Sequence, residues 1–357
     1  MLHASRLAGI PGTGRLMRLI GQSLDRARSR WFEGGLSPVR REVETILRQR
    51  EFDVAYFPYP YFIRPPAIAA PIVGTFHDFN YRHSDSLDAP MRFRLERQAP
   101  QWLRACKKIV VSTRFIQKEL ESFYPGFEEK TRLIRPAVPF PDRFPTPDEL
   151  RAFSEKIRLQ KDFLLTTGWV VPHKNQAVAF EALADLKDAG KDMALVCVGP
   201  NSLELLPEVN GRGPYAQKVF DLIAQRGLVA GVDYLALGYV SDFDLQCLYK
   251  LAKAVVIPAL YEAGSFTGVE AMRAGCPVIF SHTAPNLEQA ELVDGQAWLF
   301  DPRDADDLRR ALQEIDEDPE GTLETCRRAA EKVASNLSWE RTAAGYLEAF
   351  EEALARS

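Results

Sequence analysis

Short apolar runs alternate with longer segments of helical periodicity over most of the chain, and this alternation constrains the fold more than any other feature. Such runs are typical of buried strands, and strands that alternate with helices form parallel βαβ units. The expected strands are residues 53–57, 71–76, 108–111, 163–167, 193–198, 234–237, 254–257, 277–280 and 297–300. The expected helices are residues 15–30, 38–48, 113–123, 176–189, 215–226 and 242–251, one that ends over 101–105, and several after 304.

A cluster of five prolines interrupts this alternation. Proline cannot continue a helix or a central strand, so the chain is expected to run irregularly there. The length of 357 residues suits two domains. We therefore predict two doubly wound, Rossmann-like α/β domains with a cleft between them: residues 1–140, a linker over 141–160, residues 161–337, and a closing helix over 338–357. The prolines are Pro136, Pro139, Pro141, Pro145 and Pro147.

The overall charge argues against a general nucleic-acid binder, because such proteins usually carry a strong basic excess. The formal net charge is −4, and the isoelectric point is about 5.9. The first 50 residues differ, with ten arginines, no lysine and four acidic residues, a formal charge of +6. Packing of an amphipathic helix on a sheet explains this segment most simply. Contact with anionic lipid or a phosphorylated acceptor is the alternative.

The five cysteines and five histidines lack the spacing of a disulfide framework or a metal site. We therefore expect a reducing, cytoplasmic compartment and no protein-held metal. No apolar stretch approaches the roughly 20 residues that span a bilayer. The protein is expected to be soluble, or peripheral on the cytoplasmic face of a membrane.

Two glutamates eight positions apart, Glu262 and Glu270, mark the candidate site. They flank a loop of small residues that follows the expected strand 254–257. Small residues let a loop backbone approach a ligand, and a helix from about Thr267 would direct free N–H groups at a phosphate. Glu270 can then accept hydrogen bonds from vicinal hydroxyls, a combination that suits a nucleotide sugar. The alternative is a capping box, in which Thr267 and Glu270 satisfy the N–H groups of the helix itself.

Several segments, in order, resemble the retaining nucleotide-sugar glycosyltransferases of family 4, which have the GT-B fold. Residues 261–277 resemble the Glu-x7-Glu signature of that family, and residues 168–175 resemble its loop after the first strand of the donor domain. The similarity covers residues 160–345 well and the N-terminal part loosely. The other matching segments are Gly238-Tyr239-Val240-Ser241, residues 286–289, Phe300-Asp301-Pro302 and Ser338-Trp339-Glu340.

The resemblance implies a role for each matched position. Glu270 would bind the ribose hydroxyls, Glu262 would contact hydroxyls of the transferred sugar, and Lys174 would neutralise the diphosphate. A solvated lysine near a helix start is the plainer interpretation of Lys174, but a cation there is unfavourable against the helix dipole. The remaining implied donor-binding residues are Gly264, Ser265, Phe266 and Thr267 in the anion cradle, and Tyr239 and Val240 beside the base.

In the N-terminal part, Thr75-Phe76-His77-Asp78 resembles the strand-end His-Asp pair of the family, whose histidine faces the donor sugar. A purely structural histidine is the alternative. Gly12-Thr13-Gly14-Arg15 resembles the glycine loop that approaches the donor phosphates. The implied catalytic residues are therefore His77, Lys174 and Glu262, and Gly12 and Gly14 join the donor-binding set.

The implied reaction is transfer of a sugar from a GDP- or UDP-linked donor to an acceptor hydroxyl, with retention at the anomeric carbon. The leaving diphosphate would help to deprotonate the acceptor, so charge stabilisation matters more than a side-chain nucleophile. No cofactor or metal is implied beyond the nucleotide sugar itself. The acceptor would be a carbohydrate or lipid-linked molecule in polysaccharide or glycoconjugate synthesis.

The chain departs from the family pattern at several positions. Trp169 and His173 stand where family members often carry arginine, and residues 1–11 are poor in large apolar side chains. The first strand of the N-terminal domain is therefore expected to be truncated or degenerate. A catalytically inactive nucleotide-binding scaffold and a GT-B nucleotide-sugar epimerase or hydrolase are the alternative functions. The sequence leaves open the base, the sugar, the acceptor and the oligomeric state.

Overall fold

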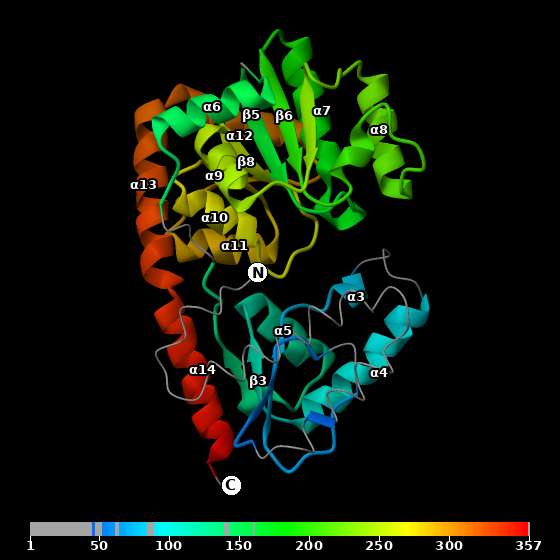
Figure 1. Cartoon of the computed structure of the whole chain (residues 1–357), viewed down its shortest axis with the longest axis vertical. Helices are drawn as coiled ribbons and strands as arrows, with labels where there is room; N and C mark the ends of the chain where they lie inside the picture. Colours follow the sequence, from blue (N-terminus) through cyan, green and yellow to red (C-terminus); the bar gives the residue numbers. More distant parts are fainter. Residues whose placement is uncertain are drawn as a thin grey trace.

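The structure of the chain is a computed structural model, and it describes residues 45–46, 52–60, 64–83, 89–138, 143–159 and 161–355. These residues form two α/β domains stacked end to end, with the N-terminal domain at the bottom of Figure 1 and the C-terminal domain at the top. The helix expected over 15–30, the glycine turn of Gly12 and Gly14, and any strand before them lie outside the described residues.

The N-terminal domain is built on a parallel sheet of four strands in the order β1-β2-β3-β4. One face carries an apolar core that includes the fully buried Phe76, Trp102 and Ile109, and helices α4 and α5 cover it. The elements are β1 (Ala55–Phe57), β2 (Ile72–Phe76), α3 (Asn80–His83), α4 (Ala89–Ala105), β3 (Cys106–Val111), α5 (Arg114–Phe123) and β4 (Thr131–Leu133).

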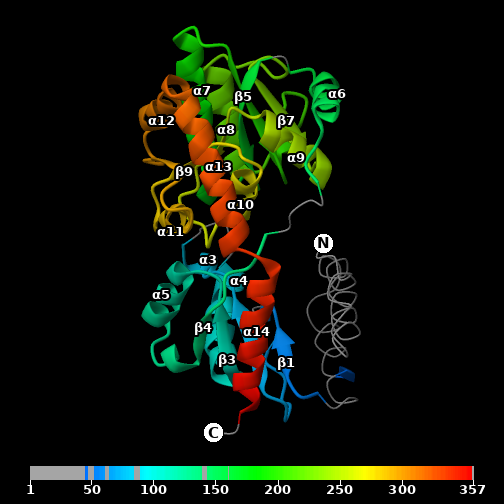
Figure 2. The ribbon, with the colours of Figure 1, turned by 90° about the vertical axis from the view of Figure 1, so that its left-hand side faces the viewer.

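The opposite face of this sheet is covered by the last helix of the chain, α14 (Trp339–Leu354). Ala349 and Ala353 of α14 pack against Val73 of β2. Figure 2 shows α13 (Pro319–Asn336) along the C-terminal domain and α14 continuing along the N-terminal domain. The chain therefore crosses between the domains twice, and the C-terminal helix completes the N-terminal domain.

The C-terminal domain contains a parallel sheet of six strands in the order β10-β9-β8-β5-β6-β7. Alternate strand residues enter two cores, one formed with α7, α8 and α12 and the other with α6, α9, α10 and α13. The strands are β5 (Asp162–Thr167), β6 (Met193–Val198), β7 (Tyr234–Gly238), β8 (Ala254–Ile257), β9 (Val278–Ser281) and β10 (Trp298–Phe300). The helices are α6 (Pro147–Ile157), α7 (Gln176–Asp188), α8 (Pro214–Gln225), α9 (Asp242–Leu251), α10 (Phe266–Arg273), α11 (Ala284–Leu292) and α12 (Ala305–Glu317).

The strand order reverses between β5 and β8, which pair with each other at the centre of the sheet. A reversal of this kind leaves a crevice beyond the carboxyl ends of the two strands, and doubly wound sheets bind ligands there. The loop after β5 holds Lys174, and the loop after β8 holds Glu262. The topology alone therefore brings two of the predicted site residues to one place.

The two-domain α/β fold is confirmed, and every expected strand is present within two residues of its expected bounds. The proline cluster, however, does not keep the chain irregular throughout. Thr146 and Glu149 form a capping box that begins α6, and Pro147 occupies its first turn, a position that favours proline. Phe153 of α6 packs into a core of the C-terminal domain.

Candidate functional site

Lys174 and Glu262 form an ion pair at the point where the strand order reverses. The Glu262 side chain is 7% exposed and that of Lys174 is 27% exposed, so the pair lies largely out of water. Asn175 shapes the lysine loop: its backbone is left-handed, with φ at 55°, and its side-chain amide donates to the Pro258 carbonyl at 3.1 Å. An ammonium group has three N–H donors, so Lys174 can serve a second acceptor without leaving Glu262.

Ser265 begins helix α10, and the β8–α10 loop (residues 258–265) leads to it. The Ser265 hydroxyl accepts a hydrogen bond from the Gly268 N–H at 3.2 Å, so Ser265 is the N-cap and Thr267 lies inside the first turn. The capping-box interpretation of Thr267 and Glu270 is therefore wrong. Phe266 and Thr267 sit at the start of the helix, where backbone N–H groups have no partner within the helix itself.

Glu270 lies one turn further along α10 and accepts a hydrogen bond from the Tyr249 hydroxyl of α9 at 3.0 Å. Burial raises the pKa of Glu270 to about 7, with the negative charge of Asp242 as a smaller contribution in the same direction. The hydrogen bond from Tyr249 opposes this rise. Glu270 is thus a half-buried carboxyl group whose hydrogen-bond partner within the described residues is neutral, so it can still accept hydrogen bonds from hydroxyl groups of a ligand.

Gly264 allows the β8–α10 loop to pass closely between two neighbours. Its φ is +144°, and a Cβ atom would approach the Gln289 amide to 3.2 Å and the Thr113 methyl group to 3.3 Å. With its amide oriented to satisfy both groups, Gln289 accepts from Ser265 N–H at 2.6 Å and donates to the Ser265 carbonyl at 3.1 Å. A larger residue at position 264 would strain the backbone and crowd both contacts.

Tyr239 and Val240 follow β7, two strands away from the central reversal. The Tyr239 side chain is 76% exposed, whereas Val240 packs partly against the core of the domain. Phe266, at the start of α10, is also exposed, at 46%. Two exposed aromatic rings at the carboxyl ends of strands are suited to contact a planar base, because stacking requires an accessible face.

His77 and Asp78 follow β2 at the carboxyl end of the N-terminal sheet. The Tyr59 ring stacks on His77, with centroids 6.1 Å apart, and burial lowers the pKa of the imidazole below its ordinary value. His77 is therefore neutral at pH 7. Two residues further on, the Phe79 N–H donates to the Tyr261 hydroxyl at 3.4 Å, so this loop contacts the β8–α10 loop.

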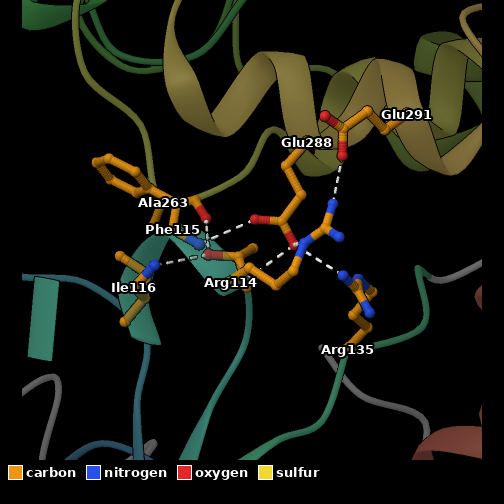
Figure 3. A network of polar contacts seen from close by, with 8 residues as sticks. Arg114, Phe115, Ile116, Arg135, Ala263, Glu288 and Glu291 are labelled. Atoms are coloured by element: carbon orange, nitrogen blue, oxygen red, sulfur yellow. Dashed lines mark hydrogen bonds and ion pairs between the residues drawn. The ribbon is translucent and has the colours of Figure 1, made fainter. Parts of the chain in front are cut away.

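Helix α5 of the N-terminal domain meets α11 of the C-terminal domain in a polar network (Figure 3). Glu288 of α11 accepts hydrogen bonds from the backbone N–H groups of Arg114 and Phe115, each at 2.9 Å, and from Arg135 Nη2 at 2.8 Å. Arg114 also forms an ion pair with Glu291. Residues 286–289 resemble a family loop in sequence, but that resemblance predicts no role for Glu288.

Sequence reasoning also missed Tyr249, Tyr261 and Thr113, because nothing in the local sequence predicts a partner from a distant element. His173 differs from the arginine expected at its position in charge as well as in type. Burial, together with the adjacent Lys174, lowers the pKa of His173 to about 4, so its imidazole is neutral. Lys174 is therefore the cation that the 168–175 loop supplies.

The described residues contain no group of three or more His, Cys, Asp and Glu side chains arranged to hold a metal ion. Within the same part of the chain, no helix combines the length and apolar character that crossing a membrane requires. All five cysteines are buried and unpaired.

Two family models match the chain. The model described as glycosyl transferases group 1 covers residues 148–334, and that described as glycosyltransferase family 4 covers residues 18–140. The first match spans the C-terminal sheet, the lysine loop and both glutamates.

Curated relatives match at low identity. The serotype-specific mannosyltransferase WbdA of Escherichia coli is 26% identical over 200 residues, which are 55% of this chain and 22% of that protein. The D-inositol 3-phosphate glycosyltransferase of Salinispora arenicola is 25% identical over 260 residues, which are 70% of this chain and 55% of that protein. The chain spans between 22% and 55% of the length of these two relatives.

Solved structures show the same two-domain architecture. Anabaena Alr3699/HepE, solved in complex with UDP-glucose, superposes with a TM-score of 0.70 at 17% identity, over 88% of this chain and 81% of that one. At this identity the likeness shows the fold, which is GT-B.

Proposed function

The chain belongs to the glycosyl transferases group 1 family, and we propose that it moves a sugar from a GDP- or UDP-linked donor to an acceptor hydroxyl with retention at the anomeric carbon. The observation that carries the proposal is the Lys174–Glu262 ion pair where the C-terminal strand order reverses, with Glu270 on α10, the helix that follows the loop of Glu262. A cation, a buried carboxylate and a second carboxyl group suit a diphosphate, a hexose and a ribose, respectively.

In this proposal the C-terminal domain binds the donor. Glu270 accepts hydrogen bonds from the two ribose hydroxyls. The first N–H groups of α10, around Phe266 and Thr267, donate hydrogen bonds to the diphosphate. Tyr239 and Val240 lie beside the base, and Gly264 and Ser265 keep the loop close to the phosphates. Lys174 Nζ bridges Glu262 and a diphosphate oxygen.

The transfer step requires stabilisation of the leaving diphosphate. Lys174 provides a fixed positive charge in a site partly shielded from water, where electrostatic interactions are stronger than in solution. Glu262 holds the ammonium group and accepts a hydroxyl of the transferred sugar, while neutral His77 approaches that sugar from the N-terminal domain. The acceptor hydroxyl attacks from the same face as the departing diphosphate, whose oxygen takes the acceptor proton. No protein-held metal takes part.

The acceptor side is proposed on the N-terminal domain. Several curated relatives are named as mannosyltransferases, among them the serotype-specific mannosyltransferase WbdA and the O-antigen chain mannosyltransferase B of Escherichia coli. By analogy we propose a carbohydrate or lipid-linked acceptor in polysaccharide or glycoconjugate synthesis, and a cytoplasmic location. The basic first 50 residues would then contact an anionic membrane surface.

Calorimetry with a panel of nucleoside diphosphates, followed by assays with the matching nucleotide sugars, tests this function. We expect one base to bind, and NMR of the product to show the anomeric configuration of the donor. Binding without acceptor-dependent transfer would instead indicate a nucleotide-binding scaffold, and conversion of the donor sugar to an isomer would indicate an epimerase. If no nucleoside diphosphate binds at millimolar concentration, the proposal is wrong.

A further inference from the structure

The β8–α10 loop is held by the N-terminal domain on both sides of Glu262. The Tyr261 hydroxyl donates to Glu119 Oε2 at 2.9 Å, and the Thr113 hydroxyl donates to the Ala263 carbonyl at 3.0 Å. Glu119 lies on α5, and Thr113 is the N-cap of the same helix. The residues immediately before and after Glu262 are therefore hydrogen-bonded to one helix of the opposite domain and its N-cap.

The Tyr261 ring is buried among residues of the N-terminal domain. It stacks on His83 of α3, with centroids 4.3 Å apart and an interplanar angle of 18°, and contacts the ring of Phe115 of α5 at 5.8 Å. Its hydroxyl also accepts from the Phe79 N–H at 3.4 Å. Only 9% of Tyr261 is exposed, so a side chain of the C-terminal domain has its packing environment in the other domain.

Glu119 links the position of Tyr261 to the packing of the two domains against each other. The carboxylate is 7% exposed, and burial raises its pKa, while the hydrogen bonds from Tyr261 and His83 act in the opposite direction. If the domains separated, Glu119 would lose the Tyr261 hydroxyl. A buried carboxylate that loses a donor is unfavourable, so Glu119 favours the docked position of Tyr261.

The first turn of α5 also contacts α11 (Figure 3). Helix α11 in turn supports the end of the β8–α10 loop. The Glu288 carboxylate, 6% exposed, accepts from two free N–H groups at the start of α5, where the helix dipole favours a negative charge. The next residue, Gln289, contacts Ser265 at the end of the loop. Thr113 and Glu288 thus attach α5 to the loop and to the helix that supports it.

We propose that Tyr261 and Thr113 are positioning residues, which set the Glu262 carboxylate against Lys174 by docking the β8–α10 loop on α5. This inference rests on the proposed function, because Glu262 is taken to contact the transferred sugar. Glu270 and Tyr249 are bonded to each other within the C-terminal domain and need no such docking. Nucleotide binding should therefore be independent of Tyr261 and Thr113, whereas sugar transfer should depend on both.

Hydrogen exchange of the ligand-free protein tests the docking itself. Tyr261→Phe keeps the ring and removes the hydroxyl, and the matched control Tyr81→Phe removes a buried hydroxyl that contacts Tyr124 Oη at 2.7 Å within the N-terminal domain. We expect amides of residues 260–264 to exchange at least about fivefold faster in Tyr261→Phe, the factor for loss of one hydrogen bond, and to be unchanged in the control. Thr113→Val, which removes the hydroxyl, should also raise the exchange rate of these amides. Thr113→Ser, which keeps a hydroxyl, should leave it at the wild-type value.

Transfer kinetics test the positioning role. For Tyr261→Phe and Thr113→Val we expect kcat to fall about fivefold or more, while the Kd of the nucleoside diphosphate changes less than twofold. Unchanged exchange in both variants would overturn the inference, whether or not the protein binds nucleotides. Faster exchange with unchanged kcat would also overturn it. If the wild-type protein binds no nucleotide sugar, the proposed function fails and the role of Glu262 with it, yet faster loop exchange would still support the docking.

Discussion

The β8–α10 loop and helix α10 follow each other in the chain, but they are held by different parts of the molecule. The loop places Glu262 beside Lys174, and its neighbours Tyr261 and Ala263 are bonded to the N-terminal domain. Helix α10 has its own N-cap, and Glu270 is bonded to α9 of the same domain. One domain is thus sufficient to organise the nucleoside half of the proposed site, whereas the sugar half depends on both.

Replacement of Lys174 should have the largest effect. We expect Lys174→Gln to lower kcat/KM for transfer by about 10² to 10³, the range for removal of one electrostatic stabiliser of a leaving group. The affinity for nucleoside diphosphate should fall less than kcat, because Lys174 contacts one diphosphate oxygen while Glu270 and the amides of α10 remain. Steady-state kinetics together with calorimetry separate the two quantities.

Lys187→Gln is a matched control for this change. Lys187 pairs with Asp233 at 2.7 Å, and the carboxylate of that pair is 7% exposed, the same fraction as in Glu262. Both variants leave a buried carboxylate without its cation and should lose similar stability. Only Lys174→Gln should lose transfer activity. Equal losses of activity in the two variants would mean that the Lys174–Glu262 pair is structural.

Glu270 should determine nucleoside affinity rather than transfer. We expect Glu270→Ala to weaken binding of the nucleoside diphosphate by ~1 to 3 kcal/mol, about 5- to 150-fold in Kd, because two ribose hydroxyls lose their acceptor. The 2′-deoxynucleotide serves as the ligand control. It should bind the wild-type protein weakly and bind Glu270→Ala no worse than the ribonucleotide does. If the variant still prefers the ribonucleotide, Glu270 does not hold the ribose.

The pH dependence of binding should follow Glu270 as well. Burial raises the pKa of Glu270 to about 7, and acceptance of two hydroxyls requires the deprotonated carboxylate. Nucleotide affinity should therefore increase about tenfold between pH 6 and pH 8, and this increase should vanish in Glu270→Gln. In the ligand-free protein the folded state holds the extra proton, so stability should fall as pH rises from the ordinary carboxyl pKa to about 7. A pH-independent Kd would contradict the assignment.

The part of the site that is local in sequence was predictable, and the part that spans the domains was not. The spacing of Glu262 and Glu270, the small loop residues and the strand before them indicated a strand–loop–helix unit, because periodicity and turn chemistry act over a few residues. The Lys174–Glu262 pair was not predictable in this way, because only the strand order of the folded sheet brings the loops after β5 and β8 together. Tyr261 shows the limit, since an aromatic residue before a glutamate is equally consistent with a core position, and only tertiary packing reveals that it enters the other domain.

The smallest expected effect concerns Ser265, which lies at the boundary of the two segments. Ser265→Ala removes the N-cap of α10, and Ser241→Ala is the matched control, because Ser241 caps α9 in the same way, through the N–H of Asp244 at 3.0 Å. Each change should lower the free energy of unfolding by ~1 kcal/mol. Only Ser265→Ala should weaken nucleotide binding, by less than the Glu270→Ala change, and it should leave exchange at the amides of residues 261–263 unaltered. If those amides exchange faster, the start of α10 and the β8–α10 loop respond as one unit. In that case the C-terminal domain does not organise the nucleoside half of the site independently of the sugar half.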